Sequence, residues 1–123
     1  MKPVEVVSEW VERFNAANVD GLLELYAEDA VNHQVVTDPL EGREAIRRLF
    51  EVDFARAKMV CVVEKIHEAG EWAILEWSDP LGLRGCVFFQ IKEDKIVLQR
   101  GYFDHLSFFR SQGIPVPDEY LAK

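Results

Sequence analysis

The chain has 123 residues, about half of them (49%) apolar, and its formal net charge is −8. A single domain spanning residues 1–123 is predicted, because this is the commonest length for one domain. The acidic charge argues against nucleic acid and anionic membrane surfaces as partners, since both are bound through basic patches.

Helical spacing of apolar residues dominates the first half of the chain. A first helix is predicted over residues 4–17, where an apolar stripe faces one side and acidic residues occupy the others. A second helix, which contains Tyr26, fades near Asp29. A short extended run over residues 30–37 and a turn then lead to a third helix, which begins near Arg43.

Strand patterns fill the second half of the chain. They cover residues 59–67, 72–78, 84–91 and 95–104. Residues 60–63 are apolar at every position, which is typical of a strand buried on both faces. One face is expected to pack on the helices and the other on a second copy of the chain, so a homodimer is predicted. A short helix over residues 105–112 should follow, and then an extended tail over residues 113–123 that lies over the body or the partner.

Helices that precede a run of antiparallel strands predict the α+β class. We expect a curved antiparallel sheet to wrap around the three helices as a cone with a pocket inside. Cys61 and Cys86 lie in strand patterns, and without a signal-peptide pattern they are interpreted as reduced thiols, with a disulfide as the alternative. A cytoplasmic location is therefore expected. No metal and no cofactor is predicted, because no histidines or cysteines fall at ligand spacing.

Four motifs spread along the chain share the pattern of one known superfamily. FNAANVDGL at residues 14–22 resembles its first helical hairpin, and LYAEDAV at residues 25–31 resembles its helix-to-strand junction. GREAI at residues 42–46 is similar to the start of its third helix. KIV at residues 95–97 with RGYFD at residues 100–104 resembles its last strand. This is the nuclear transport factor 2-like superfamily, which includes SnoaL-like cyclases, limonene epoxide hydrolases and ketosteroid isomerases. The resemblance implies a cone-shaped, cystatin-like α+β barrel.

The resemblance also implies which positions would carry catalysis. In limonene epoxide hydrolases an Asp-Arg-Asp group activates water, and these positions fall on Asp79, Trp77 and Gly101. The Tyr and Asn that hold the water fall on Asn32 and Gln34. SnoaL-type cyclases also place their base near Gly101. Only one carboxylate of these sets is therefore present in this chain.

Ketosteroid isomerases need an Asp base and an oxyanion hole made by a Tyr and a protonated Asp. In this resemblance the three positions fall on Gln34, Trp10 and Val87. Gln34 cannot abstract a proton and Val87 cannot donate one, so this activity is not expected. Tyr26 matches a tyrosine of the second helix that joins the hydrogen-bond network of those enzymes.

The expected pocket is apolar and contains a few amides. In the epoxide-hydrolase register, the strand period of two turns the following site residues inward: Asn32, Gln34, Trp77, Asp79, Val87, Phe89, Gln99, Gly101 and Phe103. Trp10 and Tyr26 are expected to contact a substrate from the helices. Gly101 either leaves room for a ligand or lets a neighbouring side chain fill the gap. Asp79 is the candidate catalytic base, and its alternative role is to start an exposed turn with Pro80.

Three hypotheses about function remain open. The first is a hydrolase or an isomerase/cyclase that acts on a small apolar substrate, with Asp79 as base and with Asn32 and Gln34 as positioning groups. The second is a non-catalytic binding protein for an apolar ligand. The third is a dimeric interaction module in which aromatic side chains such as Trp10 and Trp77 fill a vestigial pocket.

Overall fold

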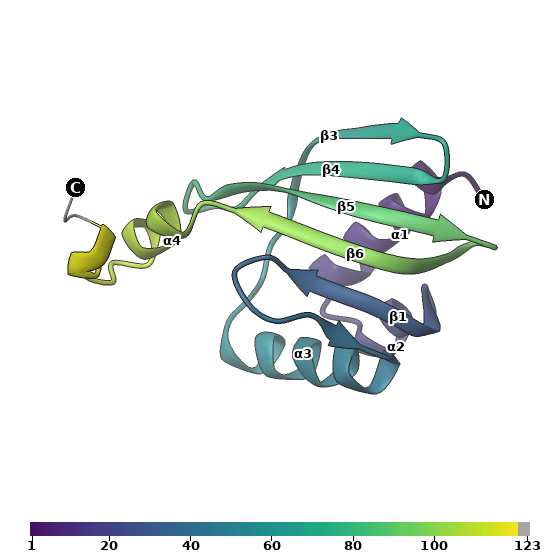
Figure 1. Cartoon of the computed structure of the whole chain (residues 1–123), viewed down its shortest axis with the longest axis horizontal. Coiled ribbons are helices and arrows are strands. Elements are labelled where there is room, and N and C mark those ends of the chain that lie inside the picture. The colour runs from purple at the N-terminus through teal and green to yellow at the C-terminus, as the bar shows by residue number, and fades with distance from the viewer. Residues whose placement is uncertain (121–123) are drawn as a thin grey trace.

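The computed structural model describes residues 1–120, apart from the side chain of His105. The last three residues of the predicted tail lie outside the described residues. The elements in chain order are α1 (Pro3–Asn15), α2 (Val19–Leu23), β1 (Tyr26–Gln34), β2 (Leu40–Glu41), α3 (Arg43–Arg56), β3 (Val62–Ala69), β4 (Trp72–Ser78), β5 (Arg84–Lys92), β6 (Lys95–Phe103), α4 (His105–Ser111) and the 3-10 turn η1 (Asp118–Tyr120). Figure 1 shows a curved sheet with α1 crossing behind it. The predicted α+β class is confirmed.

Six strands form one sheet in the order β2-β1-β6-β5-β4-β3. Strands β3 to β6 form an antiparallel meander, whereas β1 pairs with β6 in parallel. The sheet is therefore mixed, and this one pairing departs from the antiparallel sheet that was predicted. The chain reverses direction between β3 and β4, between β4 and β5, and between β5 and β6. After these three reversals β6 runs in the same direction as β1.

Helix α1 forms where the apolar stripe predicted it. Pro3 opens the helix, where a missing backbone N–H costs no hydrogen bond. The buried residues Val6, Val7, Trp10 and Val11 recur at spacings of three and four, and this face packs against β3, β4 and β5. No helix within the described residues is long and apolar enough to cross a membrane.

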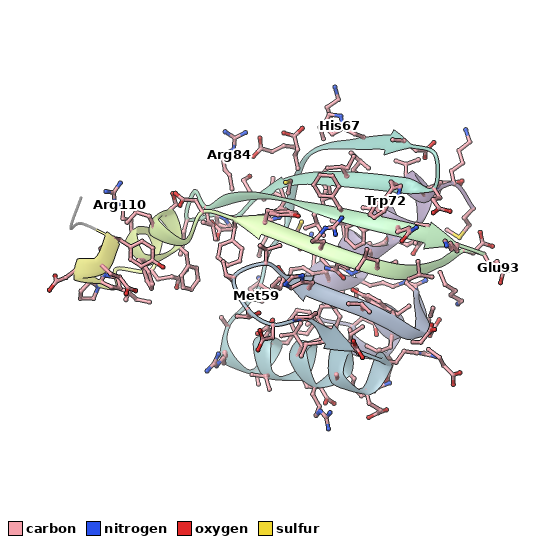
Figure 2. All side chains as sticks on the ribbon, viewed as in Figure 1. Met59, His67, Trp72, Arg84, Glu93 and Arg110 are labelled. Carbon is pink, nitrogen blue, oxygen red and sulfur yellow. The ribbon has the colours of Figure 1, made fainter. Side chains whose placement is uncertain are left out.

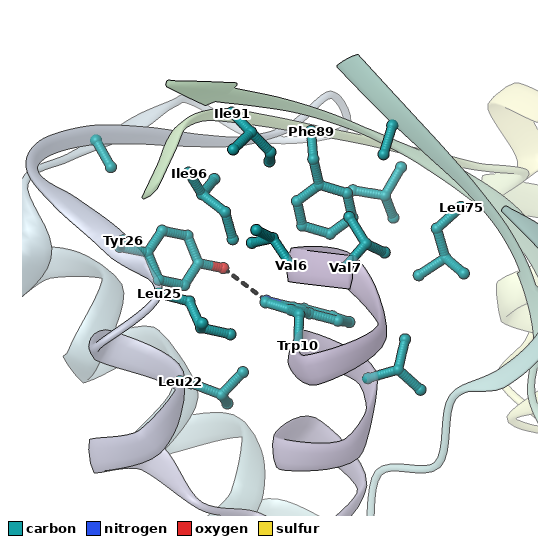
Figure 3. Close-up of a cluster of buried hydrophobic side chains, with 14 of the residues drawn as sticks. Val6, Val7, Trp10, Leu22, Leu25, Tyr26, Leu75, Phe89, Ile91 and Ile96 are labelled. Carbon is teal, nitrogen blue, oxygen red and sulfur yellow. Dashed lines mark hydrogen bonds between the residues drawn. The ribbon is translucent and has the colours of Figure 1, made fainter. Parts of the chain in front are cut away.

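The core lies between α1 and the inner, concave face of the sheet (Figure 3). The ring of Trp10 meets Phe89 of β5 edge-on, with 5.3 Å between ring centroids. On its other side Trp10 stacks on Phe14 at 4.9 Å. Leu75 of β4 and Ile96 of β6 are fully buried against the same cluster. Burial of this apolar surface joins the helical half of the chain to the strand half.

The second predicted helix is shorter than expected. α2 ends at Leu23, and Tyr26, which was predicted to be helical, is the first residue of β1. The backbone N–H of Ile96 donates to the carbonyl of Leu25 at 2.7 Å, and Tyr26 is the register partner of Ile96. Pairing with β6 thus outweighs the local helix propensity of this segment.

The C-terminal helix α4 lies where it was predicted. The carboxylate of Asp104 caps it by accepting the backbone N–H groups of Leu106 and Ser107, each at 3.2 Å. Figure 1 shows α4 and the segment after it extending beyond the end of the sheet. Within this chain, the described part of the tail does not lie over the body, because it follows α4 away from β6.

Candidate ligand site

The sheet register brings most of the predicted site residues onto one face. Across β1 and β6, Asn32 is the partner of Gln99, and Gln34 is the partner of Gly101. Across β5 and β6, Phe89 is the partner of Gln99. Register partners share a face, so these side chains all lie on the inner face toward α1. The register also puts the predicted residues Trp77, Val87 and Phe103 on this face, together with Ala73 and Leu75.

A chain of hydrogen bonds links α1 to this inner face. The indole N–H of Trp10 donates to the hydroxyl of Tyr26 at 2.9 Å (Figure 3), and that hydroxyl donates to Oε1 of Gln99. Because an indole nitrogen can only donate, the Tyr26 hydroxyl directs its own proton to Gln99. This orients the Gln99 amide with its oxygen toward Tyr26. Burial raises the pKa of Tyr26, which keeps the hydroxyl protonated and the chain intact.

A second hydrogen bond orients the amide of Asn32. Nε2 of Gln34 donates to Oδ1 of Asn32 at 3.0 Å. The oxygen of Asn32 is therefore engaged, as is the oxygen of Gln99. Within residues 1–120, neither Nδ2 of Asn32 nor Nε2 of Gln99 has a protein acceptor. The NH₂ groups of two register partners on adjacent strands can thus each donate a further hydrogen bond.

These two amide nitrogens border space that water can enter. Asn32 and Gln99 are only 2% and 3% exposed. In the described part of the chain, the one fully buried side-chain nitrogen or oxygen without a partner is Nε of Arg100. The small accessible area left on Asn32 and Gln99 must therefore include their amide nitrogens. The two NH₂ groups can therefore donate hydrogen bonds to an oxygen of water or of a ligand.

Gln34 occupies the space that a side chain at position 101 would need. A Cβ built on Gly101 would collide with the Gln34 amide. Of the two roles predicted for Gly101, the structure supports the second, in which a neighbouring side chain fills the gap. A carboxylate at this position, as in the epoxide hydrolases, would displace Gln34 and break its bond to Asn32.

Asp79 is half-buried in the loop between β4 and β5. Its Oδ1 accepts the backbone N–H groups of Leu81 and Leu83, both at 2.9 Å. These bonds are those of the turn role that was the alternative for Asp79. Oδ2 accepts no hydrogen bond from the described residues. The role of Asp79 as a base stays a prediction.

Aromatic side chains lie at the end of the cone where β6 meets α4. The ring of Trp77 lies against Gly85, where a Cβ would collide with it. Gly85 is also the register partner of Phe103. Phe103 in turn contacts Phe108 of α4, with 5.9 Å between ring centroids. These rings line the end of the inner face next to α4.

One half-buried acidic residue of α3 was missed by the sequence analysis. Asp53 lies in the last turn of α3 and is half-buried. Burial raises its pKa, and the charge of Arg56 opposes this in part. Its signal in the sequence is its place seven residues after Ile46 and three after Phe50, on the apolar stripe of the helix.

The structure has two surface hollows. One, of about 400 Å³, is lined by residues of β3 to β6, among them the predicted site residues Trp77 and Phe103. The other, of about 570 Å³, lies beside the first turn of α3. Neither is lined by Asn32 or Gln99, so the apolar pocket inside the cone stays a prediction. Within residues 1–120, no three metal-ligating side chains gather in one place.

Comparison with protein families gives one match, to the family described as SnoaL-like domain, over residues 7–99. No curated protein matches the chain.

Several solved structures share the fold. A protein with a ketosteroid isomerase-like fold from Catenulispora acidiphila, solved in complex with trimethylamine, is 19% identical; the alignment covers 95% of this chain and 100% of that one, with a TM-score of 0.82. A limonene epoxide hydrolase-like enzyme of M. tuberculosis is 20% identical, with coverage of 89% and 87% and a TM-score of 0.79. An NTF2-like protein from Cytophaga hutchinsonii is 19% identical, with coverage of 89% and 96% and a TM-score of 0.76. The resemblance to the nuclear transport factor 2-like superfamily is confirmed. At these identities the likeness shows the fold alone.

Proposed function

This chain belongs to the SnoaL-like domain family, and on that premise we propose that it binds a small, largely apolar molecule that carries an oxygen acceptor. The observation that carries this proposal is the pair of NH₂ groups of Asn32 and Gln99, which lie side by side and have no acceptor within residues 1–120. A carbonyl, ether or epoxide oxygen of a ligand would accept from both groups. The surrounding apolar side chains would contact the rest of the molecule.

The arrangement favours binding over catalysis. The central inner face offers amide donors and one buried hydroxyl, and the carboxylate position of the relatives is held by Gly101 with Gln34 beside it. Amides orient an oxygen but neither take up nor release a proton at neutral pH. The binding protein is therefore the hypothesis that the geometry supports best.

Titration calorimetry with the neutral ketone 4-phenylbutan-2-one tests this proposal. Its carbonyl should accept from the two amides, so Asn32→Leu and Gln99→Met should each weaken binding by about tenfold, as expected for one lost hydrogen bond. Gln90→Met is the matched control, because Gln90 is an amide on the opposite face of the sheet, bonded to Glu71. Equal affinity for all four proteins would overturn the proposal.

A catalytic function through Asp79 is the second candidate, and it is supported by the free Oδ2 of this half-buried carboxylate. Turnover of a panel of epoxides and enolisable ketones, with Asp79→Asn as the comparison, tests it. Asn at this position retains a side-chain oxygen for the turn but cannot act as a base. Turnover by the parent chain that falls at least tenfold in Asp79→Asn would establish this second function, and equal rates would exclude Asp79 as the base.

We also propose that the chain forms a homodimer through the outer face of the sheet. Apolar side chains gather there on neighbouring strands: Trp72, Ile74, Phe88, Leu98 and Tyr102. Figure 2 shows Trp72 on this face, which is turned away from α1. Tyr102 is 40% exposed, and Nε of Arg100 is buried with no acceptor among the described residues. A second copy would cover the former and could supply an acceptor for the latter.

Sedimentation velocity at micromolar concentration tests the dimer. The parent chain should sediment as a dimer and Tyr102→Glu as a monomer, because a carboxylate in an apolar interface is costly to desolvate. A monomeric parent chain would exclude the dimer. A cytoplasmic location is retained as a proposal, and the free thiols of Cys61 and Cys86 support it.

A further inference from the structure

Helix α3 turns an acidic residue toward the sheet. Asp53 follows Ile46 by seven residues and Phe50 by three, and both of these side chains are buried, at 0% and 3% exposure. At 100° per residue, Asp53 lies on the same face of the helix as this pair. This face packs against β1 and β2. An acid is thus present at a position where the helix pattern calls for an apolar residue.

The carboxylate of Asp53 has no partner that would explain its burial. Among the described residues its carboxylate accepts no hydrogen bond and forms no ion pair, and the charge that lowers its pKa is that of Arg56. It also lies in the last turn of α3, where the helix dipole disfavours a negative charge. Loss of water and an unfavourable dipole both act against the charged form. Such a group is stabilised by a cation that approaches from outside the chain.

Aromatic rings lie next to this acid along the same helix. Phe50 and Phe54 stack with 5.8 Å between ring centroids, and Phe54 meets Phe14 of α1 edge-on at 5.3 Å. Phe54 and Phe14 are only partly buried. The faces of aromatic rings attract cations, most strongly where water is scarce. The end of α3 therefore combines a poorly solvated anion with ring surfaces that suit an alkylammonium group.

Figure 1 places this end of α3 at the same end of the molecule as the last residues of β1, where Gln34 lies. We propose that the molecule bound in the cone carries a protonated amine, which pairs with Asp53 at the C-terminal end of α3 and lies against the partly buried ring of Phe54. This inference rests on the proposed binding function and narrows its ligand class to apolar amines that also bear an oxygen acceptor. The amine and the acceptor would contact different residues, so the two claims can be tested separately.

The test compares two probes with one carbon skeleton. 4-Phenylbutan-2-amine is a cation at pH 7, whereas 4-phenylbutan-2-one is neutral. Calorimetric titration at low ionic strength should show that Asp53→Asn weakens binding of the amine by about tenfold or more, as expected for the loss of a charge-assisted contact, and leaves the ketone unchanged. Glu51→Gln is the matched control, since it removes one charge from an exposed position of the same helix. It should change the affinity of either probe less than about twofold.

The outcomes separate the two claims. If the ketone binds through Asn32 and Gln99 but the amine binds equally to the parent chain and to Asp53→Asn, this inference is overturned and the proposed function stands. If the amine depends on Asp53 and the ketone does not bind, the amine contact stands and the oxygen site fails. An amine that does not bind at all overturns the inference. A second readout needs no variant: the carboxyl ¹³C resonance of Asp53 should shift when the amine is added, and an unchanged resonance would contradict the contact.

Discussion

Neighbouring residues of β6 show how different the two faces of the sheet are. Gln99 faces inward, where its oxygen accepts from Tyr26 and its nitrogen borders accessible space. Arg100 faces outward, where its Nε is buried without an acceptor and its guanidinium lies over Trp72 at 5.9 Å. The inner face leaves amide donors of Asn32 and Gln99 without an acceptor, whereas the outer face leaves a buried guanidinium nitrogen without one. This difference is the basis of the two proposals above, a small ligand on the inner face and a second copy of the chain on the outer face.

The largest expected effect is a difference in unfolding free energy between substitutions on the two faces of the sheet. Phe89 and Phe88 are adjacent on β5, and only Phe89 is fully buried. Phe89→Ala should lower the free energy of unfolding by about 3–5 kcal/mol, because it leaves a cavity against Trp10. Phe88→Ala should cost clearly less in urea unfolding at submicromolar concentration, where any dimer is weakened. Equal costs for both variants would remove the distinction between the faces.

The next effect concerns the gap at Gly101. Gly101→Ala should cost about 1 kcal/mol, because the added Cβ forces the Gln34 amide to move and to lose its bond to Asn32. In a Gln34→Ala background the same substitution should cost much less, since the obstructing side chain is gone. Urea unfolding of the four proteins gives the coupling energy directly. Additive costs would show that Gln34 does not fill this space.

Alkaline pH should reveal the buried hydroxyl of the inner face. Burial raises the pKa of Tyr26 above its ordinary value, and it raises the pKa of the Cys61 thiol to about 11. Above about pH 9 to 10 the unfolded chain therefore loses these protons first, and the native state binds more protons. The free energy of unfolding should fall as pH rises, by up to about 1.4 kcal/mol per unit for each group.

Tyr26→Phe and Cys61→Ala should each remove part of this slope in urea unfolding between pH 8 and 11. Tyr26→Phe should also cost stability at pH 7, because it leaves Oε1 of Gln99 without its donor. A slope that is the same in the parent chain and in Tyr26→Phe would contradict the protonated hydroxyl inferred for the inner face.

The smallest effect concerns the edge of the inner face. Asp79→Ala should cost about 1 kcal/mol, because two backbone N–H groups lose their acceptor. Asp79→Asn keeps a side-chain oxygen and should be close to neutral in thermal unfolding. If Asp79→Asn proved as costly as Asp79→Ala, the negative charge and not the turn geometry would be what this loop requires.

The sequence predicts the strands well where one face of the strand is buried and sets the order of apolar and polar residues. The register implied by the epoxide-hydrolase resemblance, with the strand period of two, placed Gln99, Phe89 and Gly101 on one face, and the strand pairing puts them on one face. It could not place Tyr26 in a strand, because that assignment depends on pairing with Ile96, seventy residues away. Nor could it show that Gln34 covers Gly101, since this depends on which strand lies next to β6. The parallel direction of β1 relative to β6 could not be predicted either, because it also depends on which strand lies next to β6.

The candidate site was only partly accessible from the sequence. The period of two relates Asn32 to Gln34 on one face, but which amide atoms remain available follows from contacts with Tyr26 and Trp10. Asp53 had a readable signal, because it interrupts the stripe of Ile46 and Phe50.

The most direct test of the donor pair follows the side-chain amide resonances of a ¹⁵N-labelled chain during titration with 4-phenylbutan-2-one. The NH₂ signals of Asn32 and Gln99 should shift together and saturate with one dissociation constant, while those of Asn15 and Gln90 stay in place. Asn15 is bonded to Cys61 and Gln90 to Glu71, so neither has a reason to respond. Saturable binding of the ketone that leaves the signals of Asn32 and Gln99 unmoved would contradict the account.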